Sequence, residues 1–159
     1  MPVQVGDHVE DLAVTVCDGE TFRSVQIGDL VGDRGLVLVA TGLAFSAIAR
    51  NWWKRFERYG WDEFEGVPVV GFSRDGPYAQ NEFLRDLERP EFRFVADVDG
   101  AMTDGLGLRT EREGMAGIST PWRAVVVVDD GLEVQFVHVA NDWITPLPHE
   151  GVEDAVEEL

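Results

Sequence analysis

Two apolar runs separated by an amphipathic stretch place the strongest constraint on how this chain can fold. Residues 36–40 and 67–72 carry no charged side chain, which is typical of strands covered on both faces of a sheet. Between them, one helical face is formed by Phe45, Ile48, Ala49, Trp52, Trp53, Phe56 and Tyr59. Gly60 is expected to end this helix. A strand–helix–strand unit of this kind joins parallel strands by a right-handed crossover.

The rest of the chain extends this unit into an α/β fold. The other expected elements are a hairpin of residues 12–16 and 21–25, a helix from Asp75-Gly76-Pro77 to Arg89-Pro90, a strand at 92–95, a helical turn at 100–106, a hairpin of 122–128 and 132–139, and a helix at 151–159. Pro68 indicates that its strand starts nearby or lies at an edge. We predict a three-layer α/β/α sandwich with a mixed central sheet, formed by a single domain over residues 1–159.

Charge excludes several classes of partner. The chain has 30 acidic and 13 basic residues, a net charge of −17, and Lys54 is its single lysine. Nucleic acids and anionic lipid surfaces would repel such a chain. No apolar segment approaches the ~18 residues of a membrane span, and no signal peptide is apparent, so we expect a cytoplasmic protein.

This acid-rich, lysine-poor composition resembles that of proteins from extreme halophiles such as haloarchaea. Dense negative charge repels itself at low salt, whereas molar salt shortens the Debye length to about 3 Å. The composition therefore predicts a fold that salt stabilises. An ordinary acidic protein is the alternative.

Cysteine and histidine offer little for metal or redox chemistry. Cys17 is the only cysteine, which excludes an internal disulfide and a CxxC pair. His8, His138 and His149 lie far apart in sequence and show no metal-ligand spacing. We expect no metal and no cofactor.

The order of the elements matches a thioredoxin fold with an added N-terminal hairpin, and short motifs make the resemblance more specific. The sequence resembles the peroxiredoxins (the alkyl hydroperoxide reductase and thiol-specific antioxidant family) over residues 5–142. The segments that carry the resemblance are Val5-Gly6-Asp7 with Glu10-Asp11-Leu12, residues 69–75, Phe94-Val95-Ala96-Asp97, and Pro121-Trp122-Arg123-Ala124 with Asp129. The resemblance implies a thiol-peroxidase lineage and a homodimer.

The decisive segment is 42–49, which lies where the family carries P-x-x-x-T/S-x-x-C. Ser46 keeps the hydroxyl, but Gly42 replaces the proline and Ala49 replaces the peroxidatic cysteine. Trp52 stands where an acidic residue is common, and Arg123 stands where the family has its arginine. Peroxide reduction needs a thiolate to attack the O–O bond, and a methyl group cannot do this. The sequence therefore predicts a protein without peroxidase activity that acts as a binding or regulatory module.

Three alternatives remain open at this site. Cys17 could serve as the redox thiol, although its neighbours Asp18 and Glu20 would raise its pKa. Arg123 and Ser46 could hold a small anion with the N–H groups of the helix start, or Arg123 could form a structural salt bridge. The alanine could be natural or an engineered replacement of cysteine.

The first long helix carries two further features. Arg50, Lys54 and Arg58 recur every four residues, either as a docking stripe for an acidic partner or as local ion pairs with residues such as Glu57 and Asp62. Of the adjacent tryptophans, one is expected in the core. The other could fill the vacated pocket or enter a dimer interface.

Overall fold

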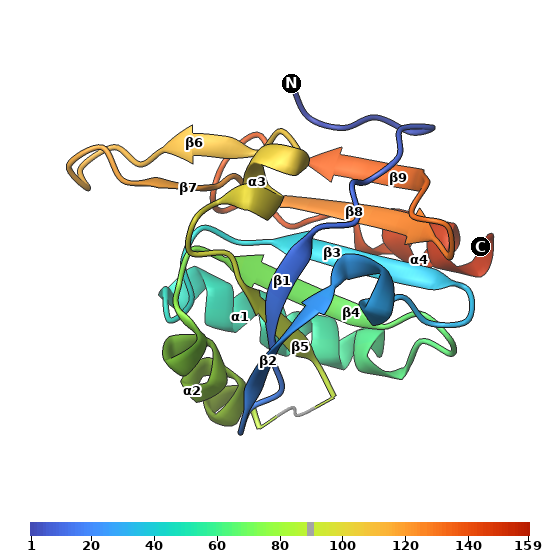
Figure 1. Ribbon diagram of the computed structural model, residues 1–159, viewed down its shortest axis with the longest axis horizontal. Coiled ribbons are helices and arrows are strands. Elements are labelled where there is room, and N and C mark those ends of the chain that lie inside the picture. Colours follow the sequence, from blue (N-terminus) through green and yellow to red (C-terminus); the bar gives the residue numbers. More distant parts are fainter. Residues whose placement is uncertain (89–90) are drawn as a thin grey trace.

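Alternating strands and helices form the middle of the computed structural model, which describes residues 1–88 and 91–159 (Figure 1). The elements run in the order β3 (Gly35–Ala40), α1 (Ala47–Arg58), β4 (Val69–Ser73), α2 (Pro77–Leu87) and β5 (Arg93–Ala96). These three strands are parallel neighbours, with β4 between β3 and β5. The parallel arrangement predicted from the apolar runs is therefore confirmed.

Antiparallel hairpins extend this parallel centre on both sides. On one side, β1 (Ala13–Cys17) pairs with β5 and with β2 (Phe22–Gln26). On the other side, β8 (Ala124–Asp129) pairs with β3 and with β9 (Val134–Val139). The strand order is β2-β1-β5-β4-β3-β8-β9, so the predicted mixed sheet with an N-terminal hairpin is confirmed.

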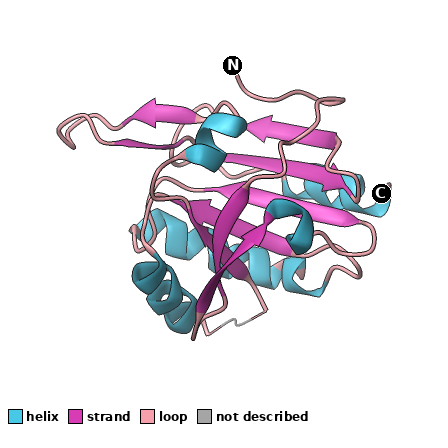
Figure 2. Ribbon diagram, in the orientation of Figure 1, coloured by secondary structure: helices cyan, strands magenta, loops and turns pink. Residues whose placement is uncertain are grey.

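The two faces of the sheet are covered unequally. Helices α1, α2 and α4 (His149–Glu157) pack on one face. The other face is covered by α3 (Ala101–Gly105), the short 3-10 helix η1 (Ile27–Leu30) and the N-terminal segment. Figure 2 shows the strands crossing between these two layers. Among the described residues, no helix is long and apolar enough to cross a membrane.

Helix α1 begins at Ala47, two residues later than the apolar pattern suggested. Phe45 has a left-handed backbone (φ 61°) and is half exposed, so it precedes the helix instead of joining its buried face. Ser46 caps the helix, and the buried face is formed by Ala49, Trp52, Trp53 and Phe56. The four residues follow the i, i+3, i+4, i+7 spacing of a helix side that faces a core.

Close packing between α1 and the sheet depends on a glycine of β4. A Cβ atom at Gly71 would lie 2.4 Å from ring atoms of both Trp53 and Phe94. The two rings pack edge to face, with centroids 4.6 Å apart. Only a glycine leaves room for both rings, and this is why α1 can lie directly on the central strands.

Other boundaries differ in detail. Pro68 immediately precedes β4, which is a central strand, so the proline marks the strand start and not an edge. The sequence analysis missed a small hairpin of β6 (Arg109–Glu111) and β7 (Ser119–Pro121), which projects at the left of Figure 1. Helix α4 begins two residues earlier than expected. The expected helix end at Arg89-Pro90 lies outside the described residues.

Candidate functional site

A small cavity lies where the carboxyl end of β3 meets the amino end of β8. Ala40 and Ala124 are paired across these strands, so the residues after Ala40 and before Ala124 approach each other. The cavity has a volume of about 110 Å³. One wall comes from the β3–α1 connection and α1, with Thr41, Gly42, Leu43, Ser46, Ile48, Ala49 and Trp52. Arg112, Arg123 and Trp143 complete the lining.

The residues singled out from the sequence motif therefore lie together. Ser46 Oγ accepts a hydrogen bond of 3.1 Å from the Ala49 backbone N–H, which is the N-cap geometry of a helix start. The Ala49 side chain is buried, with 2% exposed. The Ala49 methyl group thus lines the same cavity as Arg123, which directly precedes β8.

The β3–α1 connection is held in place by a chain of hydrogen bonds from β4 and α2. The Ala44 backbone N–H donates to Asp75 Oδ2 at 2.6 Å, and Ser73 Oγ donates to the same oxygen at 2.6 Å. Gln80 Nε2 in turn donates to Ser73 Oγ at 2.7 Å. These bonds fix the segment that carries Gly42 and Ser46 against the sheet.

Arg123 is a buried cation whose main partners are neutral. Its side chain is 2% exposed. Nη1 donates to the Asp142 carbonyl oxygen at 3.0 Å and Nη2 to the Thr145 carbonyl oxygen at 2.5 Å. The carboxylate of Asp142 is 3.9 Å from Nη1 and half exposed. Burial lowers the pKa of Arg123, and the Asp142 charge opposes this shift. The salt bridge considered from sequence is therefore a secondary contact.

Asp142 organises the turn whose carbonyl groups hold Arg123. Its carboxylate accepts the backbone N–H groups of Ile144 (2.9 Å) and Thr145 (2.6 Å) and the Thr145 hydroxyl (2.7 Å). These bonds, chiefly those from Thr145, lower the pKa of Asp142 to about 2. The turn is thus fixed by an ionised carboxylate at neutral pH.

Trp52 lies between two arginines. Its ring is 4.6 Å from Cζ of Arg123 and 5.0 Å from Cζ of Arg55, and the residue is 6% exposed. Trp52 therefore lines the cavity, while its neighbour Trp53 is fully buried in the core. Trp52 Nε1 and Arg123 Nε are both buried, and neither has a hydrogen-bond partner within residues 1–88 and 91–159. Two donors beside the cavity are thus left without acceptors.

Arg112 and Trp143 were not identified from the sequence. Cζ of Arg112 lies 4.0 Å from the centre of the Trp143 ring, which packs edge to face on Trp122. A Cβ atom at residue 42 would lie 2.3 Å from Arg112 Nη1. Arg112 therefore uses the space that a side chain at residue 42 would occupy. Gly42, which stands where the resemblance implies a proline, was the available signal, but it did not indicate which residue fills the space.

Comparisons with known proteins identify the family of this chain. Residues 5–137 match the family model described as AhpC/TSA family. The chain belongs to the AhpC/TSA family of peroxiredoxins. No curated protein matches the sequence significantly.

Solved peroxiredoxins share the whole fold at low sequence identity. A cysteine-to-serine mutant of peroxiredoxin 6 from Arenicola marina is 14% identical with a TM-score of 0.81, covering 98% of this chain and 72% of that one. Reduced Prx3 of Vibrio vulnificus in complex with H₂O₂ is 18% identical (TM-score 0.79, 97% and 99% covered). BcpB of Mycobacterium tuberculosis is 20% identical (TM-score 0.76, 96% and 94% covered). These similarities show the thioredoxin-like peroxiredoxin fold.

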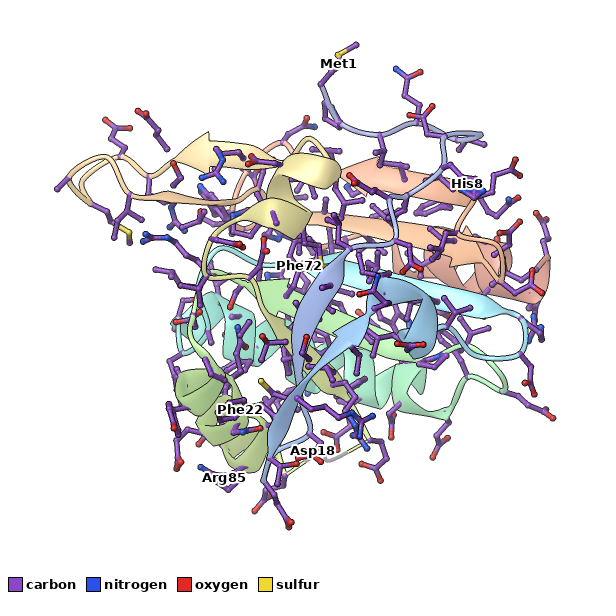
Figure 3. The ribbon with its side chains drawn as sticks, viewed as in Figure 1. Met1, His8, Asp18, Phe22, Phe72 and Arg85 are labelled. Atoms are coloured by element: carbon purple, nitrogen blue, oxygen red, sulfur yellow. The ribbon has the colours of Figure 1, made fainter. Side chains whose placement is uncertain are left out.

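Cys17 lies away from this cavity. It is fully buried on β1, and three strands separate β1 from β8 in the sheet. Its neighbour Asp18 lies at the lower end of the hairpin in Figure 3, while β8 runs through the upper half of the view. Burial, and to a lesser degree the charge of Asp18, raises the pKa of Cys17 to about 12. The sequence analysis expected the direction but attributed it to neighbouring carboxylates.

The basic residues of α1 form contacts with α2. Arg50 Nε pairs with Asp86 Oδ2 at 2.8 Å, and Lys54 Nζ donates to the Leu87 carbonyl oxygen at 2.9 Å. Local contacts thus use two of the three residues of the stripe. The partners of Arg50 and Lys54 belong to α2, whereas the sequence analysis considered Glu57 and Asp62 as ion-pair partners. Docking of an acidic protein on this stripe stays a prediction.

Proposed function

We propose that this member of the AhpC/TSA family does not reduce peroxides and acts as a binding or regulatory module. The observation that carries the proposal is the Ala49 methyl group in the cavity beside Arg123. The family reaction needs a thiolate there, at a helix start and beside a guanidinium, both of which favour the anion. Loss of a nucleophile commonly costs several orders of magnitude in rate.

The remaining thiol offers no ready substitute. Cys17 is buried, and its pKa of about 12 keeps it protonated at neutral pH. A thiol is a poor nucleophile compared with its thiolate. An active peroxidase that uses Cys17 is therefore the less supported alternative.

One assay tests both hypotheses. Peroxide consumption with a thiol reductant in molar KCl is measured for the natural sequence, Cys17→Ser and Ala49→Cys. We expect no turnover by the first two proteins and a gain of turnover in Ala49→Cys, because Ser46 and Arg123 still surround residue 49. Turnover by the natural sequence that Cys17→Ser abolishes would overturn the proposal.

A second candidate function, small-anion binding in the cavity, is supported by a buried guanidinium whose Nε has no hydrogen-bond partner among the described residues and whose nearest carboxylate is 3.9 Å away. The two groups that would face Arg123 as anions in the family, the thiolate and the acidic residue, are replaced here by Ala49 and Trp52. Arg123 is nonetheless kept, and an isolated buried guanidinium is costly. A thermal-shift screen of small carboxylates and phosphates, with Arg123→Ala as the comparison, tests this function. Equal shifts in both proteins, or no shift, would contradict it.

The combination of changes supports natural loss of the thiol and not a single engineered substitution. Gly42 and Trp52 also depart from the motif, and Arg112 occupies the space beside Gly42. Separate changes that fit one another sterically are typical of a site that has evolved away from its original chemistry.

We also propose that the protein is a cytoplasmic homodimer, as the family resemblance implies. Sedimentation equilibrium in molar KCl measures its mass in solution. A mass near the 17.7 kDa of one chain would contradict the dimer.

A further inference from the structure

We infer that Arg112 and Arg123 together form a two-arginine clamp for a short-chain carboxylate. This inference rests on the proposed anion binding and names its second binding residue and its ligand class. Arg112 comes from the loop after β6, and Arg123 directly precedes β8. Both side chains line the same 110 Å³ cavity.

Arg112 has the features of a binding residue and not of a surface charge. It is partly buried, and its Cζ lies over the Trp143 ring, 4.0 Å from the ring centre. Within the part of the chain that the structure describes, no carboxylate pairs with it. A chain with 30 acidic and 13 basic residues thus places on one small cavity an arginine with no carboxylate partner among the described residues, Arg112, and a buried arginine whose nearest carboxylate, that of Asp142, is 3.9 Å away and half exposed.

The lining indicates a carboxylate with a short apolar body. A planar guanidinium group matches a carboxylate with two parallel hydrogen bonds. Leu43, Ile48 and the Trp52 ring supply the apolar part of the lining. Because a cavity of about 150 Å³ accommodates benzene, 110 Å³ suits a ligand of about four to six non-hydrogen atoms. Propionate has this size.

Gly42 provides a way to move Arg112 without removing its charge. The severe clash that a Cβ atom would create is with the far end of the flexible Arg112 side chain, 2.3 Å away, while the Trp143 ring would lie at 3.2 Å, a tight contact that a shift of a few tenths of an ångström relieves. The backbone of Gly42 lies outside the left-handed region that disfavours alanine. Gly42→Ala should therefore displace the Arg112 guanidinium, shift the Trp143 ring slightly and leave the fold intact.

The test is a titration of sodium propionate, at constant ionic strength, followed by tryptophan fluorescence and by calorimetry. Trp52 and Trp143 line the cavity and act as reporters. The variants are Arg112→Gln and Gly42→Ala, with Arg23→Gln on the distant strand β2 as the charge-matched control. We expect saturable binding by the natural sequence and by Arg23→Gln. In the other two variants the affinity should fall about tenfold or more, as expected for a lost charged hydrogen bond.

The possible outcomes separate this inference from the proposed function. Natural-sequence affinity in both Arg112→Gln and Gly42→Ala would overturn the role of Arg112 while leaving anion binding intact. Binding of inorganic phosphate without binding of propionate would overturn the carboxylate class. Failure of the natural sequence to bind either anion would overturn the clamp and the proposed anion binding together. If Arg112→Gln unfolds, Gly42→Ala still decides the question.

Discussion

The buried surroundings of Cys17 keep its thiol protonated, whereas the reaction of its family needs a thiolate. Burial raises its pKa from 9.0 to about 12, so between these values the folded protein keeps a proton that the unfolded chain releases. The free energy of unfolding therefore falls as the pH rises above 9, by up to about 1.4 kcal/mol per pH unit. The free energy of unfolding, measured with denaturant at pH 8, 9 and 10, should fall less steeply with pH for Cys17→Ala than for the natural sequence. Equal slopes would contradict the assigned pKa.

Thiol labelling checks the same burial at neutral pH. Native Cys17 should react with a disulfide reagent many times more slowly than in denaturant, because it is 0% exposed. The same protein in denaturant is the positive control and should show one fast-reacting group. Fast labelling of the native natural sequence would show that β1 opens readily.

Single residues of the site were predictable only where a motif fixes their spacing. Gly42, Ser46 and Ala49 are close in sequence, and the resemblance added Arg123. Arg112 and Trp143 reach the cavity from separate loops, and no local pattern relates residue 42 to residues 112 and 143. Their approach follows from how the β6–β7 hairpin and the turn after β9 pack, which is a tertiary property.

At the scale of elements, the start of α1 depends on Ser46. Its hydroxyl oxygen accepts the Ala49 N–H at 3.1 Å, so Ser46→Ala should cost about 1 kcal/mol in stability. Ser46→Thr keeps the acceptor and should cost much less. Denaturant unfolding measures both, and an equal loss in the two variants would argue against capping.

The turn after β9 depends in the same way on Asp142. Folding lowers the pKa of this carboxyl to about 2, so its stabilising effect is present above its ordinary pKa near 4 and is lost as the pH falls toward 2. Asp142→Ala should lower the melting temperature at pH 7, and the difference from the natural sequence should shrink between pH 4 and pH 2. A difference that stays constant with pH would contradict this assignment.

Elements were predictable in proportion to their length and periodicity. The apolar runs of β3, β4 and β8 and the amphipathic face of α1 gave correct types and an almost correct order. The three-residue strands β6 and β7 were missed because Arg109, Thr110 and Glu111 show no apolar alternation. Phe45 was wrongly placed within the helix because its apolar character fits the periodicity while its backbone is left-handed.

At the scale of the whole molecule, the dominant feature is the net charge of −17, which makes the surface repel itself. Screening of self-repulsion should raise the melting temperature as KCl increases from dilute to molar, by roughly 2–4 °C for each kcal/mol of repulsion removed. Near the isoelectric point of about 4.3 the net charge vanishes and the salt effect should largely disappear. A melting temperature that is independent of salt at pH 7 would contradict the halophilic interpretation.

The outermost strands of the sheet give this charge a second consequence. In the described chain, β2 and β9 each pair with one strand only, and the segment around His8 covers just the beginning of β9. Unpaired strand borders invite lateral association between molecules. Repulsion between the negatively charged molecules keeps these edge strands apart in dilute buffer. The salt that stabilises the fold also screens this repulsion between molecules. The upper limit of tolerated salinity would then be set by precipitation, while unfolding would set the lower one.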